Sequence, residues 1–225
     1  MKYFDKDFTN FFKELEKNNS KEWFDKNRKR YEKSVKEPFK KFVLDLIEAL
    51  QKVYPNVDLS NEYSIMRINR DIRFSADKTP YKIHMGSMIM PNGKKDKTKP
   101  GFYIQANHKD VRVYSGAHML EKEQLQAART HIKKNLKEFD ILINDKDFVQ
   151  TFGEILGEKN KRLPKEFKEV EDKQPLIANK SFYWYFKLKP ETLTRDGLID
   201  ALVSRYKNAL PLNCFFEKAL DLPIK

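Results

Sequence analysis

The spacing of apolar residues changes twice along this chain of 225 residues. From Asp7 to Val53 the apolar residues recur every three or four positions, which is the period of a helix that buries one side. From Val57 to Gly116 the period is two, and β-branched and aromatic residues are frequent, as expected of strands. Helical spacing returns at Glu121. Helices, then strands, then further helices predict an α+β fold with an antiparallel sheet.

The predicted fold is a mostly antiparallel sheet of about five strands, packed with N-terminal and C-terminal helices in a single α+β domain, 1–225. Helices are predicted at 7–53, 121–153 and 195–220, and the sheet core at 57–116 with a further strand at 182–189. Within the sheet core, strands are predicted at 62–74, 83–90, 101–108 and 111–116. The polar, proline-bearing residues 157–179 predict a loop with little regular structure.

Two local signals divide the N-terminal helical region. Asn18 and Asn19 interrupt the first helix, and Asn19 is predicted to cap a second helix that begins near Ser20. Pro38 lies inside the second helical stretch and predicts a kink there.

The composition is that of a folded protein. Apolar residues make up 40% of the chain, and 17 Phe, 10 Tyr and 2 Trp supply enough aromatic surface for a core despite 35% charged residues. The single cysteine, Cys214, excludes an intramolecular disulfide. No secretory signal and no membrane span of about 20 apolar residues are evident, so a cytoplasmic location is expected.

The chain carries a formal net charge of +12, which favours polyanions such as nucleic acid through long-range attraction. The excess is spread along the whole chain and consists largely of lysine, as on an ordinary solvated surface. A nucleic-acid-associated binding module is therefore an alternative rather than the first hypothesis.

The most unusual segment is 69–82, where cations and carboxylates alternate with apolar residues before a proline turn. On a strand, Asp71 and Arg73 would share one face, and Arg70 would fall among the apolar residues of the other. Burying an unpaired guanidinium costs several kcal/mol. Arg70 thus needs a carboxylate or a bound anion, unless a bulge turns it outward.

Polar residues nearby complete a predicted binding site. Asp77 and Pro80 suit a turn, after which ammonium groups and a phenol would lie close to the end of the strand. We expect a pocket between the second helix and this strand that binds a small anionic ligand, such as a phosphorylated metabolite or a nucleotide. The candidate ligand-binding residues are Asn27, Arg28, Arg70, Arg73, Lys78, Tyr81 and Lys82. Asp71 and Asp77 are candidates for a catalytic base or a Mg²⁺ ligand.

Other motifs are weak. The four histidines have no metal-binding spacing, so no metal site is predicted, and no nucleotide-binding loop or nucleophile motif identifies a cofactor or a reaction. Tyr183 and Tyr185, with Lys187 and Lys189, would lie on the outer face of the aromatic strand. They suit a stacking surface for bases, although a covered sheet explains them equally well.

The charged segment and several shorter motifs resemble an uncharacterised, mainly bacterial family, domain of unknown function 2461. The resemblance implies no reaction, but its pattern includes Trp23 and all of the candidate residues. Where that family has a run of glycines, this chain has 114–118 (Tyr-Ser-Gly-Ala-His), which counts against a backbone cradle for an anion there. The motifs that carry the resemblance are 21–24 (Lys-Glu-Trp-Phe), Asn27-Arg28, Tyr31, 70–74, 77–82, Leu163-Pro164-Lys165 and Lys180-Ser181-Phe182.

A third hypothesis assigns the charged segment a purely structural role. Its ion pairs would attach a helix to the sheet, and function would reside in a surface for a protein partner. Replacing Arg70 by alanine would then unfold the protein, whereas the anion-pocket hypothesis predicts a folded variant that has lost its ligand.

Overall fold

The computed structural model describes residues 1–54, 65–90 and 100–220. The sheet consists of β1 (Met85–Ile89), β2 (Gly101–Ala106), β3 (Val111–Ala117) and β4 (Phe182–Leu188). The N-terminal helices are α1 (Lys6–Lys17), α2 (Lys21–Lys26), α3 (Arg28–Tyr31), the π-helical turn η1 (Glu32–Lys36) and α4 (Glu37–Val53). Those that follow are α5 (Lys122–Lys134), α6 (Leu136–Ile143), α7 (Lys146–Phe152), α8 (Lys165–Glu171), η3 (Pro175–Ala178), η4 (Pro190–Thr194), α9 (Leu198–Lys207) and α10 (Leu210–Leu220).

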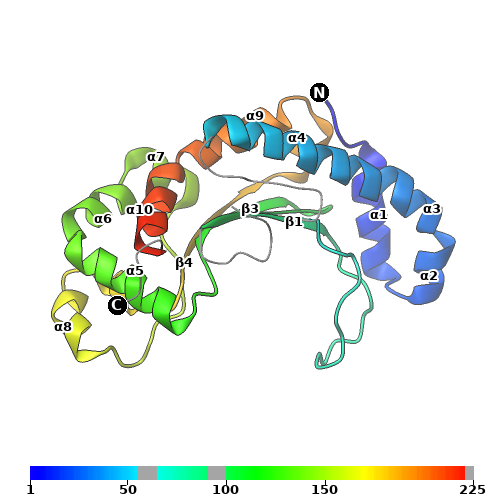
Figure 1. Cartoon of the computed structure of the whole chain (residues 1–225). Coiled ribbons are helices and arrows are strands. Elements are labelled where there is room, and N and C mark those ends of the chain that lie inside the picture. The colour runs from blue at the N-terminus through cyan, green and yellow to red at the C-terminus, as the bar shows by residue number, and fades with distance from the viewer. Residues whose placement is uncertain (55–64, 91–99, 221–225) are drawn as a thin grey trace.

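These elements form an arch (Figure 1). The sheet lies in the middle, α4 and α9 cover its convex face, and the remaining helices gather at its two ends. The strands pair antiparallel in the order β1-β2-β3-β4. The α+β class and the antiparallel sheet are confirmed, but the described sheet has four strands rather than about five. The single domain stays a prediction.

The N-terminal helices form where the apolar spacing predicts them. Phe8, Phe11 and Leu15 are buried on one side of α1, whose first turn is capped by the carboxylate of Asp5. The predicted cap of α2 is wrong by one residue. Ser20, not Asn19, accepts a hydrogen bond from the backbone of the third helical residue, at 3.2 Å.

The predicted irregularity at Pro38 is a π-helical turn, η1, directly before the proline. Proline has no N–H to donate and its ring crowds the carbonyl four residues earlier, so a regular α-helix cannot continue through it unchanged. The amide of Glu37 bonds to the carbonyl of Glu32, one residue further back than in an α-helix. The chain thereby passes from α3 into α4 without leaving the helical conformation.

The core consists of two clusters on the same side of the sheet. One joins α1, α4 and α9 to β1, β2 and β3, and the other joins α5, α6, α8 and α10 to β3 and β4. Phe152 packs against both clusters. Of the apolar face predicted for β4, Phe182, Trp184 and Phe186 are buried and Leu188 is half-buried.

The prediction of an irregular loop over 157–179 is wrong. This segment contains α8 and η3, because Phe167 and Val170 are buried one helical turn apart in α8. Arg129 of α5, which is only 3% exposed, lies against the end of η3. Its guanidinium donates to the backbone oxygens of Ile177 (2.8 Å), Ala178 (3.3 Å) and Asn179 (3.0 Å).

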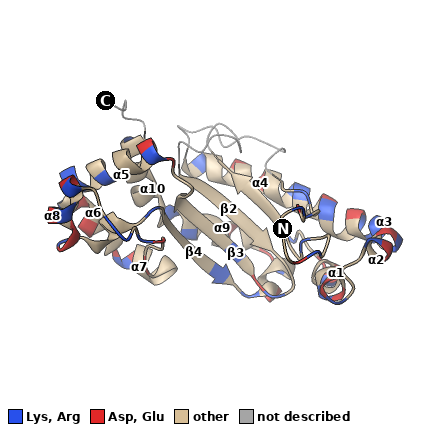
Figure 2. Ribbon diagram, turned by 90° about the horizontal axis from the view of Figure 1, so that it is seen from below, with Lys and Arg blue, Asp and Glu red and all other residues tan. Residues whose placement is uncertain are grey.

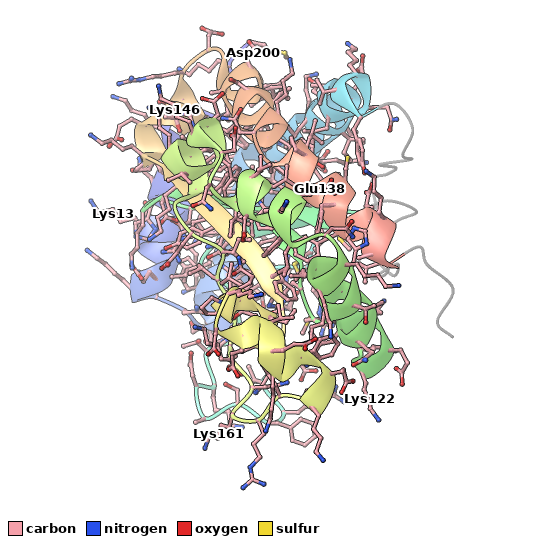
Figure 3. All side chains as sticks on the ribbon, turned by 90° about the vertical axis from the view of Figure 1, so that its left-hand side faces the viewer. Lys13, Lys122, Glu138, Lys146, Lys161 and Asp200 are labelled. Atoms are coloured by element: carbon pink, nitrogen blue, oxygen red, sulfur yellow. The ribbon has the colours of Figure 1, made fainter. Side chains whose placement is uncertain are left out.

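Charged side chains are dispersed over the molecule. Figure 2 shows Lys and Arg interspersed with Asp and Glu on the helices at both ends of the arch. Figure 3 shows Lys122 on α5, Lys146 on α7 and Lys161 before α8, each directed away from the body of the protein. Among the described helices, none combines the length and the apolar character that crossing a membrane requires.

Candidate functional site

The charged segment lies on an arm, residues 65–84, that leaves the sheet beside β1 (Figure 1). The limbs of the arm run antiparallel, and their contacts include backbone bonds of 2.8 Å from Arg70 to Pro80 and from Lys82 to Ile68. A third bond of 2.8 Å, from Met66 to Gly86, attaches the arm to β1. The arm therefore extends the β1 edge only through isolated bridges.

The strand predicted at 62–74 is wrong where the chain is described, since residues 65–74 make only isolated bridges; residues 62–64 lie outside the described part. The expected alternation of buried and exposed faces fails with it. Ile68 is buried, but Phe74 is 98% exposed. Alternating apolar residues indicate that a strand would have one apolar side. They form a buried strand only where another part of the protein packs against that side.

The arm's cations bond mostly within the arm. Arg70, whose side chain is 25% exposed, contacts Asp77 and Thr79. Arg73 pairs with Asp71 at 2.7 Å. The ammonium group of Lys78 donates to the backbone oxygen of Ile72 at 3.0 Å, and that of Lys82 donates to the oxygen of Arg67 at 2.9 Å. The four cationic groups are therefore distributed along the arm. The bonds they make do not direct them towards one point where a small ligand would bind.

The two candidate catalytic carboxylates are held ionised. Hydrogen bonds from Thr79 and then Arg70 lower the pKa of Asp77 to about 2, and the bond from Arg73 lowers the pKa of Asp71. Such groups accept hydrogen bonds but are weak bases. Their catalytic role stays a prediction.

The arm contacts the second helical region through Tyr81, and the ligand pocket predicted between them stays a prediction. The ring of Tyr81, 6% exposed, stacks on Phe24 with centroids 4.0 Å apart. Asn19 holds the same residue by its backbone: its amide nitrogen donates to the oxygen of Tyr81 (2.9 Å) and its amide oxygen accepts from the nitrogen (3.1 Å). Asn19 thus attaches the arm to the helices instead of capping α2.

The two helical candidates lie beside this contact. The guanidinium of Arg28 lies 5.4 Å from the centre of the Phe24 ring and pairs with Asp25 at 2.5 Å. The amide of Asn27 donates to the backbone oxygen of Trp23 at 2.9 Å. Tyr81 and Arg28 therefore share the Phe24 ring, whereas Arg70, Arg73 and Lys78 lie further along the arm.

Replacing Arg70 by alanine should leave the protein folded. Its partner Asp77 has a side chain 59% exposed and remains solvated when the guanidinium is removed. We expect the melting temperature to fall by about 2–4 °C, as for a partly exposed ion pair in a chain of this size. Thermal unfolding followed by circular dichroism checks this. Outright unfolding would instead support the hypothesis that the arm's ion pairs hold the fold together.

The sheet has a second face, opposite α4 and α9, which we call the open face. Figure 2 views it from below, and no described helix passes in front of its strands. Side chains alternate along each strand, so this face carries the residues that lie between the buried ones. The residues of the open face are Gly86, Met88, Gly101, Tyr103, Gln105, Arg112, Tyr114, Gly116, Tyr183, Tyr185 and Lys187.

A row of tyrosines crosses the open face. Tyr103 on β2 is opposite Tyr114 on β3, which is opposite Tyr185 on β4. Their ring centroids are 5.9 and 5.2 Å apart, and all three side chains are half-buried. The ring of Tyr103 leans over Gly86, where a Cβ atom would stand 2.7 Å from its hydroxyl oxygen. The glycine therefore makes room for one end of the row.

Cations line the neighbouring row. Arg112 on β3 is directly opposite Lys187 on β4. The Nε of Arg112 bonds to Asp110 at 2.9 Å, whereas no carboxylate among the described residues pairs with Lys187, whose ammonium group lies 5.6 Å from the centre of the Tyr185 ring. Like charges opposite each other on paired strands destabilise a sheet. Asp110 compensates Arg112, so the positive charge of Lys187 is the one in this row that an anion would stabilise.

His84, where the arm returns to β1, completes the polar group at this end of the open face. Burial, and then the positive charges of Lys82 and Arg112, lower the pKa of its imidazole to about 4, while Asp110 opposes the shift. His84 is therefore neutral at pH 7. Burial also lowers the pKa of Lys82. We refer to Lys82, Arg112 and Lys187 as the cation cluster; neutral His84 and the carboxylate of Asp110 lie beside it.

A cavity of about 840 Å³ adjoins the open face at the edge of β4. Tyr185 and Lys187 line it from the strand, Phe152 and Glu154 from the end of α7, and Arg205 from α9. The guanidinium of Arg205 donates to the backbone oxygen of Ala201 at 2.9 Å. No carboxylate in the described part of the chain pairs with it.

Sequence reasoning identified Lys82 and the Tyr183–Tyr185 strand, but it missed Arg112, His84, Tyr103 and Tyr114 as members of one site. The only indication in the sequence is that each of these residues lies on the exposed side of an alternating segment. This does not show which residues are neighbours until the pairing register of the strands is known. Within the described residues, no three His, Cys, Asp or Glu side chains gather closely enough to hold a metal ion.

Comparisons with known proteins identify the family alone. No curated protein and no solved structure gives a significant match. A family model described as a conserved hypothetical protein, DUF2461, matches residues 7–215, nearly the full length of the chain. The resemblance carried by the arm and the helical motifs is thereby confirmed, and the chain belongs to the DUF2461 family.

Proposed function

We propose that this protein binds a small anionic ligand, of the class of nucleotides or phosphorylated metabolites, on the open face of its sheet. One observation carries the proposal: Arg112 and Lys187 are opposed on paired strands beside the tyrosine row. An anionic group between them would replace a repulsion by two charge-assisted hydrogen bonds.

The surrounding residues suit such a ligand. The rings of Tyr114 and Tyr185 stack on each other next to the two cations, so a base would stack at the end of this pair while its phosphate meets Arg112 and Lys187. Neutral His84 can donate or accept a hydrogen bond without adding charge. Direct contacts from the arm, including Arg70, Arg73 and Lys78, stay a prediction within this proposal.

Binding of adenosine 5′-monophosphate, inorganic phosphate and adenosine should be compared by isothermal titration calorimetry. We expect the monophosphate to bind most tightly and Arg112→Gln to weaken it by about tenfold or more, because a hydrogen bond to a charged group is lost. Lys146→Gln, which removes an outward cation on α7, is the control and should leave the affinity unchanged (Figure 3).

The imidazole of His84 offers a second readout. A bound anion would offset the charges of Lys82 and Arg112, so the pKa of His84 should rise when the monophosphate binds, as measured by NMR titration. Equal affinity of the wild type and Arg112→Gln, with an unchanged His84 pKa, would contradict the proposal.

A further inference from the structure

The tyrosine row is longer than a single small ligand requires. It lies across three strands, with each ring on a different strand and successive centroids 5.9 and 5.2 Å apart. A ligand that contacts both Tyr103 and Tyr185 must therefore extend across the sheet. Aromatic side chains that follow one another on an open sheet face are suited to stacking several bases in succession.

The path continues beyond the sheet at β4. Tyr185 and Lys187 belong both to the open face and to the cavity of about 840 Å³, whereas Arg205 reaches the same cavity from α9 on the opposite face. The cavity thus leads around the edge strand from one face towards the other. Lys187 and Arg205 lack a carboxylate partner among the described residues, although Glu154 also lines the cavity. A polyanion following the row would pass Lys187 and meet one further cation, Arg205, here.

The arm borders the other end of the row. It leaves the sheet on the open-face side, as Figure 1 shows, and it carries Phe74 with 98% of its surface exposed. Arg73 lies 5.9 Å from the centre of that ring, and the ion pairs of the arm stabilise this segment. An exposed aromatic side chain on an ordered arm suits stacking against an unpaired base.

We infer that the ligand of the open face is single-stranded nucleic acid, whose bases stack along the tyrosine row and whose backbone passes the cation cluster and turns around β4 towards Arg205. This inference rests on the proposed function and specifies its ligand. Charge complementarity favours this partner, because Arg112 and Lys187 line one side of the row. A single strand is required, because a duplex keeps its base faces covered.

Fluorescence anisotropy with labelled oligothymidylates of increasing length tests the inference, alongside thymidine 5′-monophosphate as competitor and a duplex of the same length. We expect the affinity to rise with length until about four nucleotides fill the path, and to fall steeply as salt is raised. The single strand should bind at least about tenfold more tightly than the duplex.

Variants locate the binding. Tyr114→Leu and Tyr185→Leu retain apolar volume but remove the rings, and each should weaken binding of the oligomer by about five- to tenfold or more. Arg205→Gln should weaken long oligomers and leave the mononucleotide unaffected. Ile141→Ala on α6, which removes an apolar side chain 71% exposed, and Lys146→Gln are the controls and should change neither. Circular dichroism and thermal unfolding establish that each variant is folded.

The outcomes separate this inference from the proposed function. If the mononucleotide binds in an Arg112-dependent manner and oligomers bind no more tightly, the inference is overturned and the small-ligand proposal stands. If the duplex binds as tightly as the single strand and Lys146→Gln weakens both, general basicity accounts for binding and the inference is again overturned. If neither mononucleotide nor oligomer binds, both fail.

Discussion

Replacing Arg129 by methionine is expected to lower the free energy of unfolding by about 2–4 kcal/mol. The guanidinium donates to the backbone oxygens of Ile177, Ala178 and Asn179, and no carboxylate accompanies it among the described residues. The oxygen of Ala178 retains a bond of 2.8 Å from the amide of Asn160, but the other two oxygens lose their charged donor in a buried site. Relief of the buried charge offsets only part of that loss.

Urea unfolding followed by circular dichroism measures the effect. Lys122→Met on the same helix is the matched control, because its side chain points outward (Figure 3), and it should change stability by less than about 0.5 kcal/mol. If both variants proved equally stable, the three bonds would contribute nothing net. The end of η3 would then be ordered by apolar packing alone.

The second large effect is a loss of stability on acidification that depends on His84. The pKa of this imidazole is about 4 in the folded protein and about 6.5 in an unfolded chain. Above the unfolded value both states are neutral and pH has no effect through this group. As the pH falls from about 6.5 to 4, only the unfolded state takes up the proton, so stability is lost, in total on the order of 3 kcal/mol.

The measurement is the difference in unfolding free energy between the wild type and His84→Gln, determined in urea at several pH values. The comparison with the variant is needed because carboxylates with a lowered pKa, such as Asp77, also make the protein less stable as the pH falls. The wild type should lose stability relative to the variant between pH 6.5 and 4, and the difference should then level off. A difference that is constant over this range would show that His84 is not desolvated as the structure indicates.

Much of the fold could be predicted because local patterns and tertiary packing agree. The apolar residues of α1 recur with helical spacing and do line one cluster of the core, and the alternation at Phe182, Trp184 and Phe186 does bury one side of β4. Where the two disagree, prediction failed. The segment around Ile72 alternates like a strand, but it lies on an arm with no layer to pack against.

The candidate site was less predictable for a related reason. Arg112 and Lys187 are 75 positions apart in sequence and become neighbours only through the register of β3 and β4. A row formed by one residue from each strand has no signature within any single strand. Arg129 escaped notice because one arginine on an amphipathic helix is ordinarily exposed, and only the partner carbonyls, about 50 positions away, explain its burial.

Gly86 has a consequence for how this surface diverges among relatives. A methyl group at this position would displace the phenol of Tyr103, whose hydroxyl occupies that space and donates to the amide oxygen of Gln105 at 3.3 Å, so the ring would move at the cost of that bond. Mutation at a residue with no functional group of its own would thus reshape the surface offered to a ligand. A substitution at Gly86 would therefore change the ligand selectivity of this face during evolution, while every side chain that contacts the ligand stays the same.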